Sequence, residues 1–362
     1  MTAESKPTKK MLVVGGLGAC GRALVHHLEG RDDWEVYGLS RRKPDFSTTA
    51  KWINCDLLDP DGCRRALEGS NFTHVAYCAV LDKPSMVSGW SENDHAEMNT
   101  AMLRNILFAA EAVSTDLRHV TLMQGTKAYG KHLGPHRNPA RETDARYMPP
   151  NFYYDQEDFL RERSKTAGWS WSGFRPQSVW TPFPGGNANF IIAAGVYAAI
   201  SRELGLPLRY PGTLSRIYEA TDARLIAKAI EWAGTDERCS GEIYNITNGD
   251  VLVWDNLWPG LAKAFDMELG HPQKVQLHKV MPAHGAVWDK VVRDHRLVPF
   301  KYDAMVPSWE YIDFALGTLV NNETSHVSTI KIRQHGFGEC VDSEDLFSEL
   351  IAQAQEQRYL PR

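Results

Sequence analysis

The chain has 362 residues, of which 43% are hydrophobic and 23% are charged, and its formal net charge at pH 7 is -5. Such a chain can bury a large core in two lobes or one large domain without help from metals or disulfides. The acidic balance excludes a surface that binds nucleic acid through its phosphates, since such a surface needs a clustered excess of Lys and Arg.

The N-terminal segment and the cysteines give no sign of secretion, membrane insertion or metal binding. Residues 1–10 are polar, and no apolar run reaches the roughly 20 residues that a membrane-spanning helix needs. The six cysteines are scattered without a CxxC pair, and we expect them to be reduced core residues. The chain is therefore expected to be cytoplasmic, with no metal and no membrane or nucleic-acid partner.

The first expected strand and helix are separated by a glycine-rich turn. The apolar run at residues 11–14 predicts a strand, and GGLGACG at residues 15–21 leads from it into a helical pattern. Gly15, Gly18 and Gly21 have the GxxGxxG spacing, which lets the backbone approach a pyrophosphate at a helix N-terminus. This context predicts a bound dinucleotide, against the alternative of a plain βα turn.

Strand-like runs alternate with helical patterns as far as residue 176, as in consecutive βα units of a parallel sheet. The expected strands are Met11–Val14, Trp34–Leu39, Trp52–Cys55, His74–Val80, Val120–Gln124 and Trp171–Arg175. The expected helices in this part are His95–Val113 and Asp155–Thr166. The predicted fold class is α/β: a Rossmann doubly wound parallel sheet with helices on both faces and a smaller C-terminal substrate lobe.

The Pro- and Gly-rich segment TPFPGGNAN (residues 181–189) marks a change of character. The nearly uncharged run that follows predicts a buried helix, and later runs predict two more helices and a pair of strands. The helices are expected at Phe190–Ile200, Asp222–Ala233 and Trp254–Phe265, and the strands at Leu208–Tyr210 and Ile243–Ile246.

This change predicts two domains. Residues 1–180 are expected to form the cofactor-binding Rossmann domain, and residues 181–362 to form mainly a substrate-binding lobe. Because the late chain often crosses back to complete the main sheet in such folds, segments at about 208–250 are expected to return to it.

The end of the second expected strand indicates which nicotinamide cofactor binds. In NAD-binding folds an acidic residue at this point accepts a hydrogen bond from the ribose 2′-hydroxyl. The chain has Ser40, Arg41 and Arg42 there and no carboxylate. Guanidinium groups bind a 2′-phosphate well, so the segment predicts NADP(H), against the alternative of a solvated run of charge. Asp56, after the third strand, is expected to bind the adenine amino group, against the alternative of a turn carboxylate.

Ten short segments together make the chain resemble a known family. They are GGLGACG, VYGLSRR, NCDLLDP, HVAYCAV, MNTAMLRNIL, QGTKAYG, NFYYDQED, WSWSGFRP, GVYAAI and YNITNGDV, in family order over roughly residues 11–260. The chain resembles the extended short-chain dehydrogenases/reductases and, among them, the progesterone 5β-reductase and iridoid synthase-like enone reductases.

The resemblance implies a catalytic tyrosine and lysine that come from separate segments. Most members of the superfamily place Tyr and Lys four residues apart on one helix, but here Glu157 stands four residues after Tyr153. The enone reductases take the lysine from the end of the fifth strand, which matches Lys127. The expected catalytic residues are therefore Lys127 and Tyr153, with Tyr154 in reserve. The plainer alternatives are an exposed charge for Lys127 and aromatic packing for Tyr153.

A phenol beside an ammonium group suits a reaction in which negative charge builds on a substrate oxygen. Hydride addition to an enone and to a carbonyl both leave charge on that oxygen, so the residues alone leave both reactions open. The resemblance implies NADPH-dependent 1,4-reduction of an activated C=C bond, with the enolate held by Tyr153 and Lys127. Residues 130–136 depart from the family pattern, so the substrate stays open.

The resemblance also implies further contacts to the cofactor and the substrate. Cofactor contacts are expected at Gly15, Gly18, Ala19, Cys20, Gly21, Ser40, Arg41, Arg42, Asp56, Leu57, Ala79, Gln124, Lys127, Tyr153, Pro176, Ser178 and Val179. Pocket walls are expected at Trp90, Phe152, Trp180 and Phe190, against the alternative of plain core packing.

Three other functions stay open. A general NADPH-dependent carbonyl reductase would use the same residues. An NAD-dependent sugar-nucleotide epimerase or dehydratase shares the extended fold, but such enzymes normally use the four-residue Tyr/Lys pair that this chain lacks. A non-catalytic NADP-sensing regulator would typically lack the tyrosine. The expected partner is a small-molecule enone or carbonyl compound, and a homodimer stays open.

Overall fold

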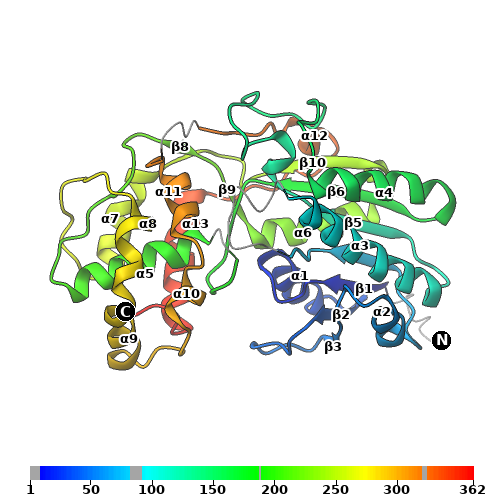
Figure 1. Ribbon diagram of the computed structural model, residues 1–362, viewed down its shortest axis with the longest axis horizontal. Helices are drawn as coiled ribbons and strands as arrows, with labels where there is room; N and C mark the ends of the chain where they lie inside the picture. Colours follow the sequence, from blue (N-terminus) through cyan, green and yellow to red (C-terminus); the bar gives the residue numbers. More distant parts are fainter. Residues whose placement is uncertain (1–8, 82–91, 187–188, 320–323) are drawn as a thin grey trace, which may run out of the picture. The chain divides into compact units, whose positions relative to one another are not determined.

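The computed structural model describes residues 9–81, 92–186, 189–319 and 324–362 (Figure 1). The chain divides into two compact units. Unit 1 consists of the residues up to Pro176 together with 223–246 and 327–338, and unit 2 consists of residues 177–222, 247–326 and 339–362. The chain therefore leaves unit 1 and returns to it twice.

Unit 1 contains a seven-stranded sheet in the order β10-β6-β5-β4-β1-β2-β3, with every neighbouring pair parallel. The strands are β1 (Lys9–Val14), β2 (Trp34–Ser40), β3 (Lys51–Asn54), β4 (His74–Tyr77), β5 (His119–Met123), β6 (Ser170–Pro176) and β10 (Glu242–Ile246). The strand order reverses between β1 and β4, and open α/β sheets bind ligands at the carboxyl ends of the strands beside such a reversal. The predicted doubly wound fold is confirmed.

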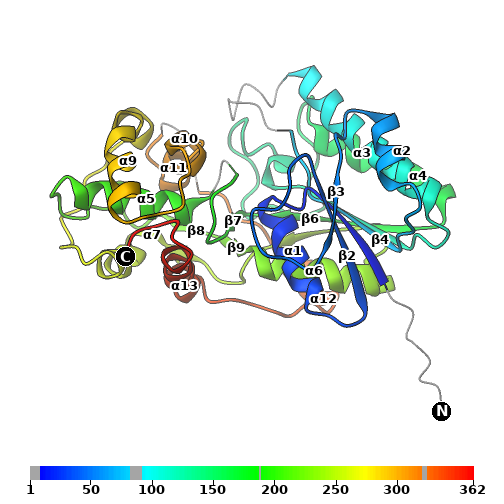
Figure 2. The same cartoon turned by 90° about the horizontal axis from the view of Figure 1, so that it is seen from below.

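Helices cover both faces of this sheet (Figure 2). One face carries α1 (Ala19–Glu29) and α6 (Ala223–Thr235), and the other carries α2 (Pro60–Leu67), α3 (Asn93–Val113) and α4 (Phe152–Ala167). Short helical turns follow β5 and α6, at η2 (Thr126–Tyr129) and η3 (Glu237–Cys239), and α12 (Ile330–Gln334) packs against β10. Apolar residues of β1, β4 and β5 pack with α3 in the core of the unit.

Strand β10 has a different partner from the one that the sequence suggested. Ile243–Ile246 belongs to β10, which pairs with β6 in the main sheet, whereas Leu208 forms an isolated bridge with Leu269. The predicted pairing of Leu208–Tyr210 with Ile243–Ile246 is therefore wrong. An apolar run identifies a strand but not the strand that it pairs with. Here β6 is a buried strand with an unpaired edge, and β10 pairs with that edge.

Unit 2 combines two short strand pairs with a group of helices. β7 (Ser178–Trp180) runs parallel to β9 (Ala220–Asp222), and β8 (Ile217–Tyr218) runs antiparallel to β11 (Leu252–Val253). The helical elements are α5 (Phe190–Glu203), α7 (Trp254–Ala264), α8 (Leu277–Val280), η4 (Met281–His284), α9 (Gly285–Asp294), α10 (Tyr302–Met305), α11 (Trp309–Leu316) and α13 (Ser343–Glu356). The nearly uncharged α5 is buried along most of its length, as predicted, and packs against α7, α9 and α13.

All six cysteines are free thiols. Cys55, Cys63 and Cys239 are buried and Cys20 and Cys78 are half-buried, whereas Cys340 is exposed. The expectation of core positions is wrong for Cys340, because it lies in a polar segment with few apolar neighbours. Within the four described ranges, no helix combines the length and hydropathy needed to cross a bilayer.

Candidate active site

The glycine turn between β1 and α1 leaves room for an anion at the start of the helix. Gly15 adopts a φ of +83°, and a Cβ there would lie 2.8 Å from the backbone nitrogen of Ala79. A Cβ on Gly21 would overlap the carbonyl oxygen of Gly15. At Gly18, by contrast, the nearest atom would be 3.4 Å away, and no side chain caps α1. The turn therefore fits a pyrophosphate at the N-terminus of α1.

Cys20 lies in the first turn of α1, after Ala19. Burial raises the pKa of its thiol to about 12, so the group is neutral at neutral pH. It therefore places no negative charge where a pyrophosphate would bind.

Two side chains of β3 hold the segment that carries the arginine pair. Asn54 Nδ2 donates to the carbonyl oxygen of Arg41 at 2.8 Å, and Trp52 Nε1 donates to that of Arg42 at 2.9 Å. Trp52 Nε1 also lies 3.2 Å from the hydroxyl of Ser40. Both arginines are exposed at the end of β2. Sequence reasoning missed Trp52 and Asn54, although their place on the next strand was predicted.

Asp56 and Leu57 follow β3. Oδ1 of the exposed Asp56 accepts a hydrogen bond from the amide of Leu58 at 3.1 Å, which is the turn geometry of the alternative interpretation. Leu57 is buried in the core of unit 1, and its carbonyl oxygen accepts from Asn105. Their contacts to a cofactor stay predictions.

The segments that carry Lys127 and Tyr153 are joined by Asn151. Lys127 lies in η2, and Tyr153 lies in the first turn of α4. Asn151 caps α4, because its side-chain oxygen accepts from the amide of Tyr153 at 3.1 Å. Its Nδ2 donates to the carbonyl oxygen of Lys127 at 3.0 Å. One side chain thus ties the start of α4 to Lys127, which lies 24 residues before Asn151 in the chain.

The hydroxyl of Tyr153 lies next to the turn that precedes Lys127. It is 3.3 Å from the position that a Cβ of Gly125 would occupy, so a side chain at Gly125 would crowd the phenol. Tyr153 itself is half-buried, as is Lys127. The phenol therefore lies at the carboxyl end of β5, on the edge of the sheet where such folds bind their ligands.

Tyr154 has a different surrounding from Tyr153. Its hydroxyl donates to the carbonyl oxygen of Ala128 at 2.8 Å and accepts from the amide of Tyr147 at 3.0 Å. Its side chain is buried. Because both contacts are to backbone groups, Tyr154 holds η2 against α4, which favours Tyr153 as the residue open to a substrate.

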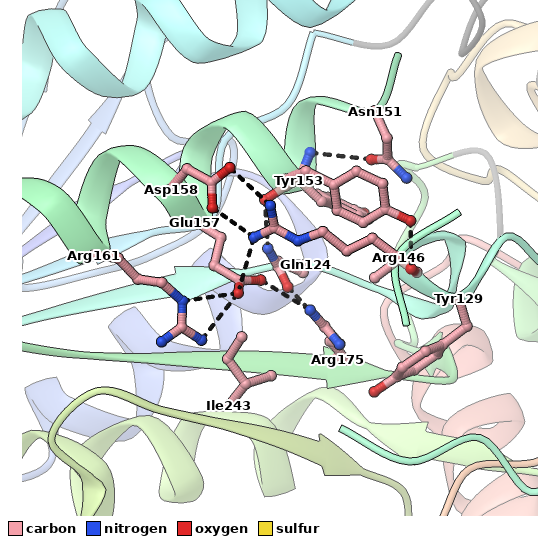
Figure 3. A network of polar contacts seen from close by, with 12 residues as sticks. Gln124, Tyr129, Arg146, Asn151, Tyr153, Glu157, Asp158, Arg161, Arg175 and Ile243 are labelled. Atoms are coloured by element: carbon pink, nitrogen blue, oxygen red, sulfur yellow. Dashed lines mark hydrogen bonds and ion pairs between the residues drawn. The ribbon is translucent and has the colours of Figure 1, made fainter. Parts of the chain in front are cut away.

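Glu157, which stands where most of the superfamily has a lysine, forms a buried ion pair. Its Oε2 lies 2.9 Å from Nη2 of Arg175 on β6, and each side chain is 6% exposed. Its Oε1 contacts Arg146 at 3.1 Å and Arg161 at 3.0 Å (Figure 3). Glu157 is therefore part of a network of ion pairs within the protein.

Gln124 connects this ion pair to Tyr153. Arg175 Nε donates to Gln124 Oε1 at 2.8 Å, and Gln124 Nε2 donates to the carbonyl oxygen of Tyr153 at 2.8 Å (Figure 3). The amide side chain is buried and engaged at both ends within the protein. The cofactor contact expected of Gln124 stays a prediction, whereas its link to Tyr153 is a contact that the sequence did not indicate.

His132 is a further residue near Lys127. Burial, and then the positive charge of Lys127, lower the pKa of its imidazole to about 4. It is therefore neutral at neutral pH. The only signal for it in the sequence was its place five residues after the lysine.

The remaining predicted site residues are distributed over both units. Phe152 is buried in unit 1, with its ring centroid 4.6 Å from that of Tyr153, and Pro176 ends β6. Ser178 and Val179 lie on β7 of unit 2. Trp180 and Phe190 are 0% and 1% exposed in the apolar core of unit 2. Their role as pocket walls stays a prediction, and Trp90 lies outside the described residues.

Known proteins are similar to this chain over nearly its whole length. Residues 11–247 match the NAD dependent epimerase/dehydratase family. The (S)-8-oxocitronellyl enol synthase CYC1 of Camptotheca acuminata is 32% identical, over 97% of this chain and 93% of the relative. The (S)-8-oxocitronellyl enol synthase ISY1 of Nepeta cataria is 33% identical, over 97% and 92%.

Solved structures resemble the fold at lower identity. A UDP-glucose 4-epimerase of Thermotoga maritima, solved with UDP-glucose, has a TM-score of 0.67 and 16% identity over 96% of this chain and 99% of its own. RMD of Pseudomonas aeruginosa, solved with NADPH, has a TM-score of 0.66 and 15% identity over 98% and 100%. At this identity the likeness shows the fold alone.

The matching family model spans more than half of the chain, and the enol synthases align with nearly all of it. The chain is therefore an enzyme that belongs to the NAD dependent epimerase/dehydratase family and, within it, to the iridoid synthase-like enzymes that its sequence motifs resemble.

Proposed function

We propose that the protein is an NADPH-dependent reductase of an activated C=C bond, as in an enone or enal. The observation that carries the proposal is the bridge made by Asn151, which ties the backbone of Lys127 to the amide of Tyr153. A lysine and a tyrosine from these two segments are what the enone reductases use. The names of the relatives, which are enol synthases, agree with a reaction that passes through an enol or enolate.

The residues at the glycine turn and at the end of β2 support NADP(H) as the cofactor. Gly15, Gly18 and Gly21 fit the pyrophosphate, and Arg41 and Arg42 supply guanidinium groups where an NAD-binding fold would have an acid. When bound, the reduced nicotinamide supplies a hydride equivalent to the substrate. The rest of the chemistry falls to side chains of this chain.

Tyr153 and Lys127 would act on the substrate oxygen. In 1,4-reduction the β-carbon gains the hydride and negative charge moves through the former C=C bond onto the oxygen. A phenol aimed at that oxygen stabilises the enolate by a hydrogen bond or protonates it, and an ammonium beside the phenol strengthens both effects. Lys127 would also orient the cofactor's ribose.

The buried pairing of Glu157 with Arg175 argues against the sugar-nucleotide epimerase alternative. That chemistry normally takes its lysine from the position of Glu157, and the carboxylate here is engaged with three arginines. The epimerase-like solved structures share the fold at 13–19% identity and give no support for their substrates.

The test is an assay of NADPH oxidation at 340 nm with a cyclic enone, an enal, a simple ketone and a UDP-sugar, each repeated with NADH. The proposal expects turnover of the enone or enal with NADPH and a saturated carbonyl compound as the released product. An allylic alcohol as product would establish carbonyl reduction instead. NADPH binding without turnover of any substrate would favour a sensing regulator.

Replacing the phenol tests the assigned chemistry directly. Tyr153→Phe removes one oxyanion donor and should lower kcat by about 10² to 10³, with little change in NADPH affinity. Tyr37→Phe is a matched control, because the hydroxyl of Tyr37 binds Glu35 on β2 and should not affect kcat. Wild-type turnover by Tyr153→Phe would remove this residue from the mechanism.

A further inference from the structure

The ion pair of Arg175 and Glu157 is unusual because it is buried. Each side chain is 6% exposed, and the two groups lie 2.9 Å apart. Taking two charges out of water is costly, and a buried pair often contributes little net stability compared with apolar residues of the same size. Its presence beside the proposed active site therefore calls for another role, and its contacts indicate one.

Arg175 contacts both segments that bear the proposed catalytic residues. Toward α4, its Nε binds Gln124, which in turn binds the carbonyl oxygen of Tyr153. Toward η2, its guanidinium carbon lies 5.0 Å from the ring centroid of Tyr129, two residues after Lys127. The guanidinium group is thus connected both to η2, which contains Lys127, and to the start of α4, which contains Tyr153 (Figure 3).

The contacts around Arg175 fix its orientation. Glu157 accepts from Nη2 on one side, so the planar fork cannot rotate without losing the ion pair. On the other side, Tyr129 donates from its hydroxyl to Asn245 Oδ1 on β10 at 2.6 Å. Burial raises the pKa of Tyr129 to about 12, so this donor keeps its proton. Arg175 is thereby held by Glu157 on α4, and Tyr129 is held by Asn245 on β10.

We propose that Arg175, held by Glu157, is a positioning residue that acts through Gln124 on Tyr153 and through Tyr129 on the turn of Lys127. This inference rests on the proposed function of Tyr153 and Lys127. In most of the superfamily, the spacing between tyrosine and lysine is set by one turn of helix. Here the two residues come from separate segments, and the buried arginine supplies the shared support that the helix no longer provides.

The first test breaks the path of hydrogen bonds from Arg175 to Tyr153 at Gln124 and leaves the ion pair of Arg175 and Glu157 intact. Gln124→Met removes both the hydrogen bond to the Tyr153 carbonyl and the acceptor of Arg175 Nε, but keeps a side chain of similar length. We expect kcat to fall by about tenfold or more, since small displacements of a catalytic group have effects of this size. Gln124 is also an expected cofactor contact, so the NADPH dissociation constant is compared in Arg175→Lys, where it should change little. Arg175→Lys keeps the charge but loses the fork, and should give the same pattern.

A double-mutant cycle separates positioning from general damage. If Gln124 acts through Tyr153, then Gln124→Met should add almost nothing to the loss of kcat already caused by Tyr153→Phe. Full additivity of the two losses would overturn the proposal. Arg161→Gln is the matched control: Arg161 binds the same carboxylate from its exposed side, so its loss should change kcat by about twofold at most.

A spectroscopic readout keeps the inference testable whatever the enzyme reduces. In protein labelled with carbon-13 at tyrosine Cζ, the resonance of Tyr153 is assigned by its absence in Tyr153→Phe. It should move in Gln124→Met and Arg175→Lys and stay in place in Arg161→Gln. An unmoved resonance in the first two variants would overturn the positioning role. Failure of wild-type protein to reduce any substrate would instead contradict the proposed function and leave this result unaffected.

Discussion

Asn151 has two tasks that one substitution can separate. Its side-chain oxygen caps α4 at the amide of Tyr153, and its side-chain nitrogen donates to the carbonyl oxygen of Lys127. An asparagine is suited to both because it carries an acceptor and a donor on one short side chain. Asn151 thereby fixes the first turn of α4, which contains Tyr153, against η2, which contains Lys127.

Asn151→Asp and Asn151→Ala should therefore differ. Asp keeps the capping acceptor but cannot donate to Lys127, so we expect near-normal stability with a lower kcat. Ala loses both contacts and should also lower the free energy of unfolding by about 1 kcal/mol. Urea unfolding and NADPH oxidation measured on both variants check this. Equal kcat in wild type and Asn151→Asp would show that the bridge to Lys127 has no catalytic effect.

Local constraints were predictable from the sequence, whereas distant ones were not. The glycine turn could be recognised because a positive φ and the absence of side chains both require glycine, and these glycines lie close together in the sequence. Lys127 and Tyr153 were found only through family resemblance. The sequence showed that Glu157 replaces the usual lysine, but it gave no sign that Glu157 pairs with Arg175, because a charged residue on a helix usually faces solvent and the pairing joins α4 to β6. Asn151 could have been found, since an asparagine before a helix is a typical cap, but the helix was expected to begin at Asp155.

At the scale of elements, β4 and β5 begin with two histidines that face each other in register. His74 binds Thr73 and the carbonyl oxygen of Gly234, and His119 binds the hydroxyls of Ser170 and Ser172. Burial lowers the pKa of His74 to about 4 and that of His119 to about 3. The amino ends of the strands are thus held by neutral imidazoles.

This pair should make the protein sensitive to acid. Each folded-state pKa lies below the ordinary value of 6.5, so below that pH the unfolded chain binds protons that the folded chain excludes. The free energy of unfolding should therefore fall as the pH drops from 6.5 toward 4, by about 2 kcal/mol per histidine at pH 5. Urea unfolding at a series of pH values measures this slope.

His119→Gln provides the comparison for that experiment, because it removes one titrating group. Its unfolding free energy should depend less steeply on pH than that of wild type, whatever its value at pH 7. The exposed His271→Gln should leave the slope unchanged. If His119→Gln shows the wild-type slope, acid sensitivity has another source.

At the scale of the whole molecule, unit 1 is assembled from three separate stretches of chain. The second stretch contributes α6, which packs on α1, and β10, which pairs with β6. β10 also carries Asn245, the partner of Tyr129 in the network around Arg175. A return of the chain near this point was expected because the late chain often crosses back to the main sheet in such folds, but a sequence pattern could not specify which edge the strand would join.

A fragment ending at Pro176 should therefore not fold as the first domain. It lacks the buried Leu225, Ile226 and Ile230 of α6, whose burial contributes about 2 kcal/mol each, and this is a large share of the total stability of an ordinary domain. We expect no cooperative urea transition for the fragment, in contrast to the intact chain. A sharp, reversible transition in the fragment would show that α6 and β10 are dispensable.

The late arrival of β10 has a consequence for how the protein is made. A ribosome that has translated β6 has produced every proposed catalytic residue, yet β10, which pairs with β6 and becomes the outer strand on this side of the sheet, emerges only after residues 177–222 and α6. Until then the growing polypeptide presents an unpaired edge, the kind of surface that promotes aggregation. Translation speed and chaperone access over residues 177–246 therefore become determinants of yield that act without changing a single side chain.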